Sequence, residues 1–176
     1  MKKLVAAFLM VAWFSAGLAD EKGKLNEHLE PFRPLLGKTW KGALKEPGKT
    51  GTSIDVSRWE RALNGEAIRT LHSVNDGAYG GETIIIWEAG QKKLIYFYFT
   101  TAGFRTTGSF AIEGRKFIAE EEVTGDAQGV TRVRSTSELR DDRTLVSKSE
   151  YLKEGKWVPG HEQVYREEPA AEVKFK

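Results

Sequence analysis

Apolar and polar positions along most of this chain alternate over short runs that are separated by turn residues, which is the pattern of β-strands. The pair Asn64-Gly65 lies between two such runs and is the strongest hairpin signal, because both residues tolerate the positive φ of a tight turn. The pattern predicts ten strands, at 38–46, 51–62, 67–75, 81–88, 93–101, 104–113, 115–123, 129–140, 143–153 and 156–166.

One segment before these strands has helical periodicity. Between Lys24 and Leu36, apolar residues recur at spacings of three and four, and Gly37 can end the helix. No segment is long enough for a crossover helix, so consecutive strands are expected to pair antiparallel. Closing such a sheet removes its edges. We therefore expect an all-β fold, an antiparallel up-and-down barrel of about 8–10 strands with a short N-terminal capping helix. A two-sheet sandwich is the alternative.

The turn at Asn64-Gly65 predicts which side chains of the adjoining strands face inward, because directly paired residues share a face. A two-residue loop pairs Glu60 with Arg69, and this charged pair belongs in water. The opposite face is then the inner one, and it carries Ser57, Trp59, Thr70 and His72.

The run 94–104, LIYFYFTTAGF, is apolar on both faces. A four-residue loop at 100–103 would pair Phe99 with Phe104, which places Phe97 and Phe99 inside and their tyrosine neighbours outside. The preceding strand is also apolar on both faces. We therefore expect its outer wall near Ile85 and Trp87 to be covered by the N-terminal segment or by a second subunit, which leaves a homodimer open.

The last strands carry charged residues on one face, which sends small polar residues and tyrosines inward. Small hydroxyl residues facing aromatic rings predict room for a ligand, although a solid core with buried water is the alternative. The predicted ligand-binding residues are Ser57, Trp59, His72, Phe97, Phe99, Ser147, Ser149, Tyr151, Gln163 and Tyr165.

The first residues change the picture of where the protein functions. Lys2-Lys3, the apolar run 4–18 and Ala19 have the layout of a bacterial secretory signal peptide at 1–19, with an uncleaved membrane anchor as the alternative. We expect a periplasmic or secreted protein without a membrane span after cleavage. It would consist of a capping segment at 20–37, one barrel domain at 38–166 and a flexible tail at 167–176.

Composition and charge exclude several classes of site and partner. The chain has no cysteine, which excludes disulfides, thiolate metal sites and cysteine nucleophiles. Its formal net charge of +2 includes Lys2 and Lys3, so the mature protein is near neutral and no nucleic-acid partner is expected.

The segment Gly37-Lys-Thr-Trp40-Lys-Gly42, entering the first strand after a short helix, resembles the start of lipocalin-like (calycin) barrels. The segments around His72 and 100–104 are also similar to bacterial exported lipocalin-like proteins of unknown function. The resemblance implies that Trp40 packs at the closed end of the barrel under a late-strand arginine, Arg166. It also implies a small, partly apolar, hydrophobic or amphiphilic ligand inside the barrel.

No catalytic motif is present, so we assign no catalytic residue, no metal site and no cofactor, and enzymatic activity is uncertain. His72 is the best single candidate for chemistry, as an acid or base oriented by Asp55 or Tyr151. Small haem-binding barrels related to this architecture use a histidine on a late strand, which makes haem at His161 an alternative. A ligand-binding protein, an enzyme that uses His72 and an oligomeric interaction module are the three hypotheses.

Overall fold

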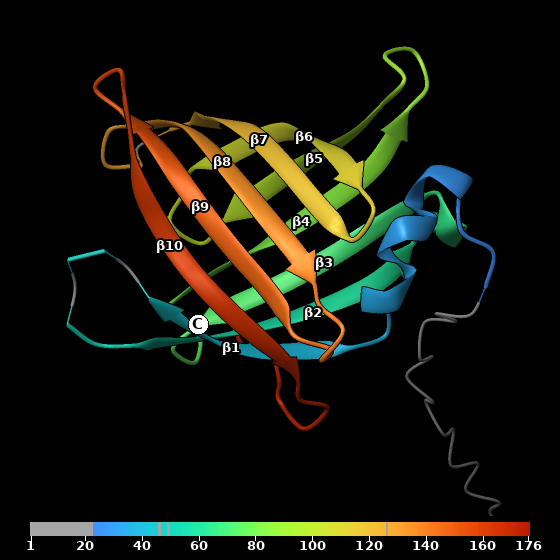
Figure 1. Ribbon diagram of the computed structural model, residues 1–176, viewed down its shortest axis with the longest axis horizontal. Helices are drawn as coiled ribbons and strands as arrows, with labels where there is room; N and C mark the ends of the chain where they lie inside the picture. The colour runs from blue at the N-terminus through green and yellow to red at the C-terminus, as the bar shows by residue number, and fades with distance from the viewer. Residues whose placement is uncertain (1–22, 46, 49, 126) are drawn as a thin grey trace, which may run out of the picture.

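The computed structural model describes residues 23–176 apart from residues 46, 49 and 126 (Figure 1). In this part of the chain each strand pairs antiparallel with the next, and the last pairs with the first, so the sheet closes into a barrel. The strands are β1 (Thr39–Lys45), β2 (Ser53–Ala62), β3 (Ala67–Val74), β4 (Tyr79–Glu88), β5 (Lys93–Thr100), β6 (Arg105–Glu113), β7 (Lys116–Thr124), β8 (Val130–Leu139), β9 (Leu145–Lys153) and β10 (Lys156–Glu167).

This closed barrel confirms the predicted all-β, up-and-down architecture and excludes the two-sheet alternative. A short 3₁₀ turn, η2 (Leu63–Gly65), lies between β2 and β3. The predicted signal peptide at 1–19 lies outside the described residues. Within the described residues, no helix has the length and apolar character needed to cross a membrane.

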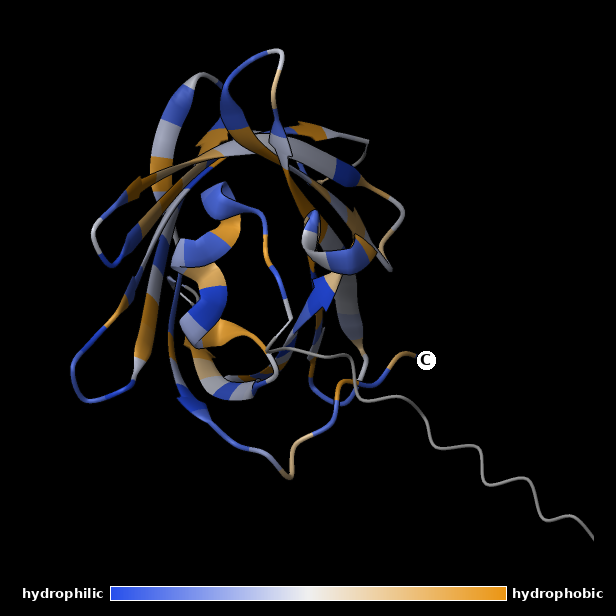
Figure 2. Cartoon of the chain, turned by 90° about the vertical axis from the view of Figure 1, so that its right-hand side faces the viewer, coloured by the Kyte–Doolittle hydropathy of each residue, from blue (hydrophilic) through white to orange (hydrophobic). Residues whose placement is uncertain are grey.

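A 3₁₀ helix, η1 (Glu27–Leu35), closes one end of the barrel, as Figure 2 shows by looking into that end. Its apolar face is fully buried, with Leu29 and Phe32 at 0% exposure. The Phe32 ring stacks on Phe117 at 4.8 Å between ring centroids and lies 6.1 Å from Trp59. We call this the plugged end, and the other end, which holds the turns after β1, β3, β5, β7 and β9, the far end.

The hairpin of β2 and β3 has the register that its sequence predicts. Glu60 pairs with Arg69, and Ser57 pairs with His72. Asn64 and Gly65 both have positive φ, at 55° and 97°. The polar inner wall is confirmed as well, because Ser147, Ser149, Gln163 and Tyr165 are all buried at 9% exposure or less.

The hairpin of β5 and β6 differs from its prediction by one residue. Phe99 pairs with Arg105 rather than Phe104, and Tyr98 pairs with Thr106. The connection is one residue longer than expected: the Thr100 N–H donates to the Phe104 carbonyl at 3.2 Å. A slip of one residue exchanges the two faces of a strand. The prediction that Phe97 and Phe99 face inward is therefore wrong, and they lie on the outer face with 37% and 52% exposure.

Two further expectations about the barrel wall are wrong, because the side chains concerned lie on the opposite face of their strands from the expected one. Ile85 is 1% exposed inside the core, and Trp87 packs against that core with its ring stacked on His28 at 3.6 Å. These two residues therefore do not form an outer contact surface, although the N-terminal segment does cover Trp87 as one alternative expected, through His28 of η1. Arg166 pairs with Lys41 and is exposed, and the cation above the Trp40 ring is Lys38, at 5.7 Å.

Trp40 itself occupies the expected position at the plugged end. It is 1% exposed, and its indole Nε1–H donates to the Leu35 carbonyl of η1 at 3.4 Å. The residues after β10 return along the outside of β1 to β3. There the Lys174 N–H donates to Ser73 Oγ at 3.1 Å, and its ammonium lies 3.2 Å from Asp76. The flexibility expected for this tail stays a prediction.

Candidate functional site

A chain of hydrogen-bonded side chains crosses the interior toward the far end of the barrel. The Tyr165 hydroxyl donates to Asp55, whose other carboxylate oxygen lies 3.0 Å from His72 Nδ1. His72 Nε2 lies 2.7 Å from the Tyr98 hydroxyl, which lies 2.8 Å from the Tyr79 hydroxyl. We call these five residues the relay. It joins β10, β2, β3, β5 and β4 through side chains alone.

The relay runs from the core to the solvent. Asp55 is 2% exposed, whereas the side chain of His72 is 23% exposed. Tyr79 and Tyr98 are also partly exposed. Since these three residues lie toward the far ends of their strands, a molecule that enters opposite η1 would meet them first.

Two glycines make room for the tyrosine rings of the relay. A Cβ atom at Gly81 would lie 2.4 Å from Cε2 of Tyr98, and one at Gly42 would lie 2.8 Å from Cδ1 of Tyr165. The same Cβ atoms would lie 2.2 Å from the Phe99 carbonyl oxygen and 2.8 Å from the Val164 carbonyl oxygen. Any other residue at these positions would therefore displace the neighbouring strand as well as the ring, because atoms do not approach so closely. The relay therefore depends on the lack of a side chain at Gly42 and Gly81 as well as on its own five side chains.

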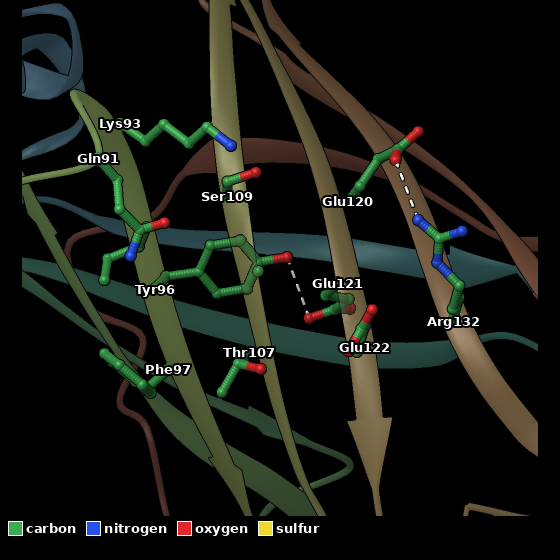
Figure 3. A pocket seen from close by; sticks show the side chains of 12 residues that line it. Gln91, Lys93, Tyr96, Phe97, Thr107, Ser109, Glu120, Glu121, Glu122 and Arg132 are labelled. Carbon is green, nitrogen blue, oxygen red and sulfur yellow. Dashed lines mark hydrogen bonds and ion pairs between the residues drawn. The ribbon is translucent and has the colours of Figure 1, made fainter. Parts of the chain in front are cut away.

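A second polar cluster lies beside the relay, on β5 to β7 (Figure 3). The Tyr96 hydroxyl donates to Glu121 Oε2 at 3.1 Å, and the Thr106 hydroxyl donates to the same oxygen. Burial raises the pKa of Glu121, although these two donors act in the opposite direction. The loss of water around the Glu121 carboxylate therefore raises its pKa by more than the two hydrogen bonds lower it.

A third contact joins β9 to β10 across the far half of the barrel. The Tyr151 hydroxyl bonds to Nδ1 of His161, and the Ser149 hydroxyl donates to the His161 carbonyl at 3.2 Å. The haem alternative through His161 stays a prediction. Among the described residues, no group of three or more histidine and acidic side chains is placed to hold a metal ion.

Burial sets the protonation of the tyrosines in the relay. It raises the pKa of Tyr98 and Tyr165 far above the usual tyrosine value, because a phenolate in the interior would lose its hydration. Burial also raises the pKa of Tyr79. The hydrogen bond with Tyr98 acts in the opposite direction, and Glu121, Tyr151 and Asp55 add to the effect of burial. All three relay tyrosines therefore keep their protons and act as hydrogen-bond donors.

The structure brings together several of the predicted site residues. His72, Tyr165 and the Gln163 amide, which lies 2.8 Å from the Tyr165 hydroxyl, belong to one network. Ser57 faces inward beside His72, and Ser147 accepts a hydrogen bond from Ser137 at 3.0 Å. Trp59 lies at the plugged end under Phe32, and Phe97 and Phe99 lie outside. The roles of these residues in binding stay predictions. For Phe97 and Phe99, the inward orientation on which that prediction rested is wrong.

Sequence reasoning missed three tyrosines and one acid of the interior: Tyr79, Tyr96, Tyr98 and Glu121. The alternation of tyrosine with phenylalanine in β5 was visible, but the face of each depended on the length of one loop. Tyr79 lies outside the strand expected at 81–88, whereas in the structure it begins β4.

A groove of about 370 Å³ lies on the outer surface of β5 to β8 (Figure 3). Two of its charged groups are paired: Arg132 approaches Glu120 at 3.4 Å, and Glu120 also lies 2.9 Å from the adjacent Arg134. Exposed pairs of this kind contribute little to binding or stability. The relay, with its partly exposed end, is therefore the stronger candidate site.

Comparison with known proteins gives the fold and no more. No family model matches the chain, and no curated protein matches it. The crystal structure of Rv2717c from M. tuberculosis is similar in fold, with a TM-score of 0.63 and 12% sequence identity, over 82% of this chain and 99% of that one. The part of the chain that the structure describes is thus a closed, ten-stranded antiparallel β-barrel, and the likeness to Rv2717c is a likeness of fold.

Proposed function

We propose that this chain is an exported, lipocalin-like protein that binds a small, partly apolar molecule in the far half of its barrel. The relay is the observation that carries the proposal. Buried ionisable groups generally stabilise a fold less than apolar residues of the same volume, so a barrel that only needed to be filled would favour Leu, Ile and Val there. A polar interior that reaches solvent at His72 and Tyr79 is better explained by a ligand.

Native mass spectrometry of the protein purified from its own host tests this proposal. We expect a bound small molecule in the wild type. Ser57→Phe, which adds a ring on the inner face beside His72, should lose it. Ser109→Phe is the matched control, because it makes the same change on the outer face, in the groove. Loss in Ser109→Phe alone would move the site to the groove, and a wild type without any bound molecule would refute the proposal.

Export is the second part of the proposal, and it rests on Lys2-Lys3 and the apolar run that follows. Sequencing the N-terminus of the protein from its host should show cleavage after about Ala19. A mature protein that still begins at Met1 would contradict it.

Acid–base catalysis is a second candidate function, because Asp55, His72 and Tyr98 follow one another in the order orienting acid, base and hydroxyl. The raised pKa of Tyr98 opposes its use as a nucleophile, since the proton is held more tightly than in water. His72 would instead act on a proton of the bound molecule. Turnover of ester, epoxide or isomerisation substrates that His72→Ala abolishes would favour an enzyme, and turnover that survives the change would reject His72.

A further inference from the structure

Each hydroxyl and each ring nitrogen in the relay can donate at most one proton. This limit fixes which partner donates and which accepts in each hydrogen bond of the relay. An ionised Asp55 can only accept. It takes the proton of Tyr165 on one oxygen, so the contact of 3.0 Å on its other oxygen requires a proton on His72 Nδ1. In neutral histidine the other ring nitrogen, Nε2, is then an acceptor.

The direction continues along the two remaining tyrosines. Because His72 Nε2 carries no proton and lies 2.7 Å from the Tyr98 hydroxyl, Tyr98 must donate its single proton to His72. The Tyr98 oxygen is then free to accept only, so the contact of 2.8 Å with Tyr79 is donated by Tyr79. All hydrogen bonds of the relay therefore point toward Asp55, and the last hydroxyl, that of Tyr79, has already used its proton.

The surroundings of Tyr79 narrow the ligand class further. Phe104 stacks against its ring at 6.5 Å between centroids, which provides an apolar surface beside the hydroxyl. The charged groups that act on Tyr79 are Asp55 and Glu121, both acidic. An anionic ligand would be repelled there, and a carboxylate has no proton with which to satisfy the Tyr79 oxygen.

We propose that Tyr79 is the ligand-recognition group of the interior and that it selects an apolar, ring-bearing molecule with a hydroxyl or amino donor over its donor-free analogue. This inference rests on the proposed binding function. It names Tyr79 as an acceptor and assigns to Asp55, His72 and Tyr98 the role of positioning residues that fix the direction of its proton. The site thus differs from one that would bind carboxylates or phosphates.

The first test needs no ligand. Long-range ¹H–¹⁵N correlation spectra of the ¹⁵N-labelled protein at about pH 8, where an ordinary histidine is neutral, report which ring nitrogen carries the proton. We expect His72 to be protonated on Nδ1 and bare on Nε2. A proton on Nε2 would reverse the relay and overturn the inference.

The second test uses calorimetric titration with 1-naphthol and 1-methoxynaphthalene, in which a methyl group replaces the donor proton of the hydroxyl. Wild type should prefer 1-naphthol by about tenfold, the effect of one unsatisfied buried polar group. Tyr79→Phe should remove this preference, and Tyr96→Phe should keep it, because the Tyr96 hydroxyl bonds to Glu121 outside the relay.

The outcomes separate the two proposals. Equal binding of both probes to wild type, or a preference that survives Tyr79→Phe, would overturn the role of Tyr79 and leave interior binding standing. Binding of neither probe at millimolar concentration would contradict interior binding of such molecules and the inference with it. Melting temperatures of both variants show whether each is folded when it is titrated.

Discussion

Tyr98→Phe removes one oxygen atom from the middle of the relay and leaves the ring in place. The Tyr98 hydroxyl bonds to His72 Nε2 at 2.7 Å and to Tyr79 at 2.8 Å, so two hydrogen bonds are lost together. At about 1 kcal/mol for each net hydrogen bond, the free energy of unfolding should fall by about 2 kcal/mol. For a chain of this length, that corresponds to a melting temperature lower by about 4–8 °C.

Phe97→Tyr is the matched control, because it adds the same atom one position earlier on the outer face. Phe97 is 37% exposed, so its new hydroxyl would reach water, and the change in stability should stay within about 0.5 kcal/mol. Thermal unfolding followed by circular dichroism measures both variants. The reasoning is refuted if Tyr98→Phe melts like wild type while Phe97→Tyr is destabilised, because β5 would then be turned the other way.

Three further changes test other parts of the molecule. Gly81→Ala should displace the Tyr98 ring and lower the melting temperature by at least as much as Tyr98→Phe, which would be wrong if the variant melts like wild type. Glu121→Gln should raise the melting temperature at about pH 8 and not at about pH 4. Because the folded state raises the pKa of Glu121, the stability that its protonated form provides is lost as the pH rises through the folded pKa. A change in melting temperature that is independent of pH would count against this. Phe32→Ala should lower the free energy of unfolding by about 3–5 kcal/mol in a urea titration, since it empties a fully buried site in η1, and a loss below about 1 kcal/mol would mean that η1 does not hold the plugged end together.

The sequence was sufficient for the fold because closure, strand number and most strand bounds follow from local alternation and turn residues. It was also sufficient for the inner face of β2 and β3, where Asn64-Gly65 leaves little freedom of register. The segment Thr100 to Phe104 carries no comparable signal. A four-residue and a five-residue connection fit it equally well, and the difference exchanges phenylalanines with tyrosines across the whole of β5.

The relay lay beyond sequence reasoning for a different reason. Its five members come from five strands, and a hydrogen bond between β2 and β10 joins residues 110 positions apart. Asp55 and His72 could be placed on one face, because a single hairpin relates them. The partner Tyr165 lies on β10 and comes close to Asp55 only because the sheet closes. Tyr98 and Tyr79 lie on β5 and β4, and they were missed because the loop after β5 and the start of β4 differ from their predictions.

The glycines under the tyrosine rings also set how closely neighbouring strands approach. A Cβ atom at Gly81 would lie 2.2 Å from the Phe99 carbonyl oxygen, and one at Gly42 would lie 2.8 Å from the Val164 carbonyl oxygen, so a smaller ring alone would not make room for it. Substitutions that shrink Tyr98 or Tyr165 can therefore enlarge the interior, whereas additions at the facing glycines would spread the strands. A protein engineer seeking new ligands for this barrel would change the tyrosines and keep the glycines.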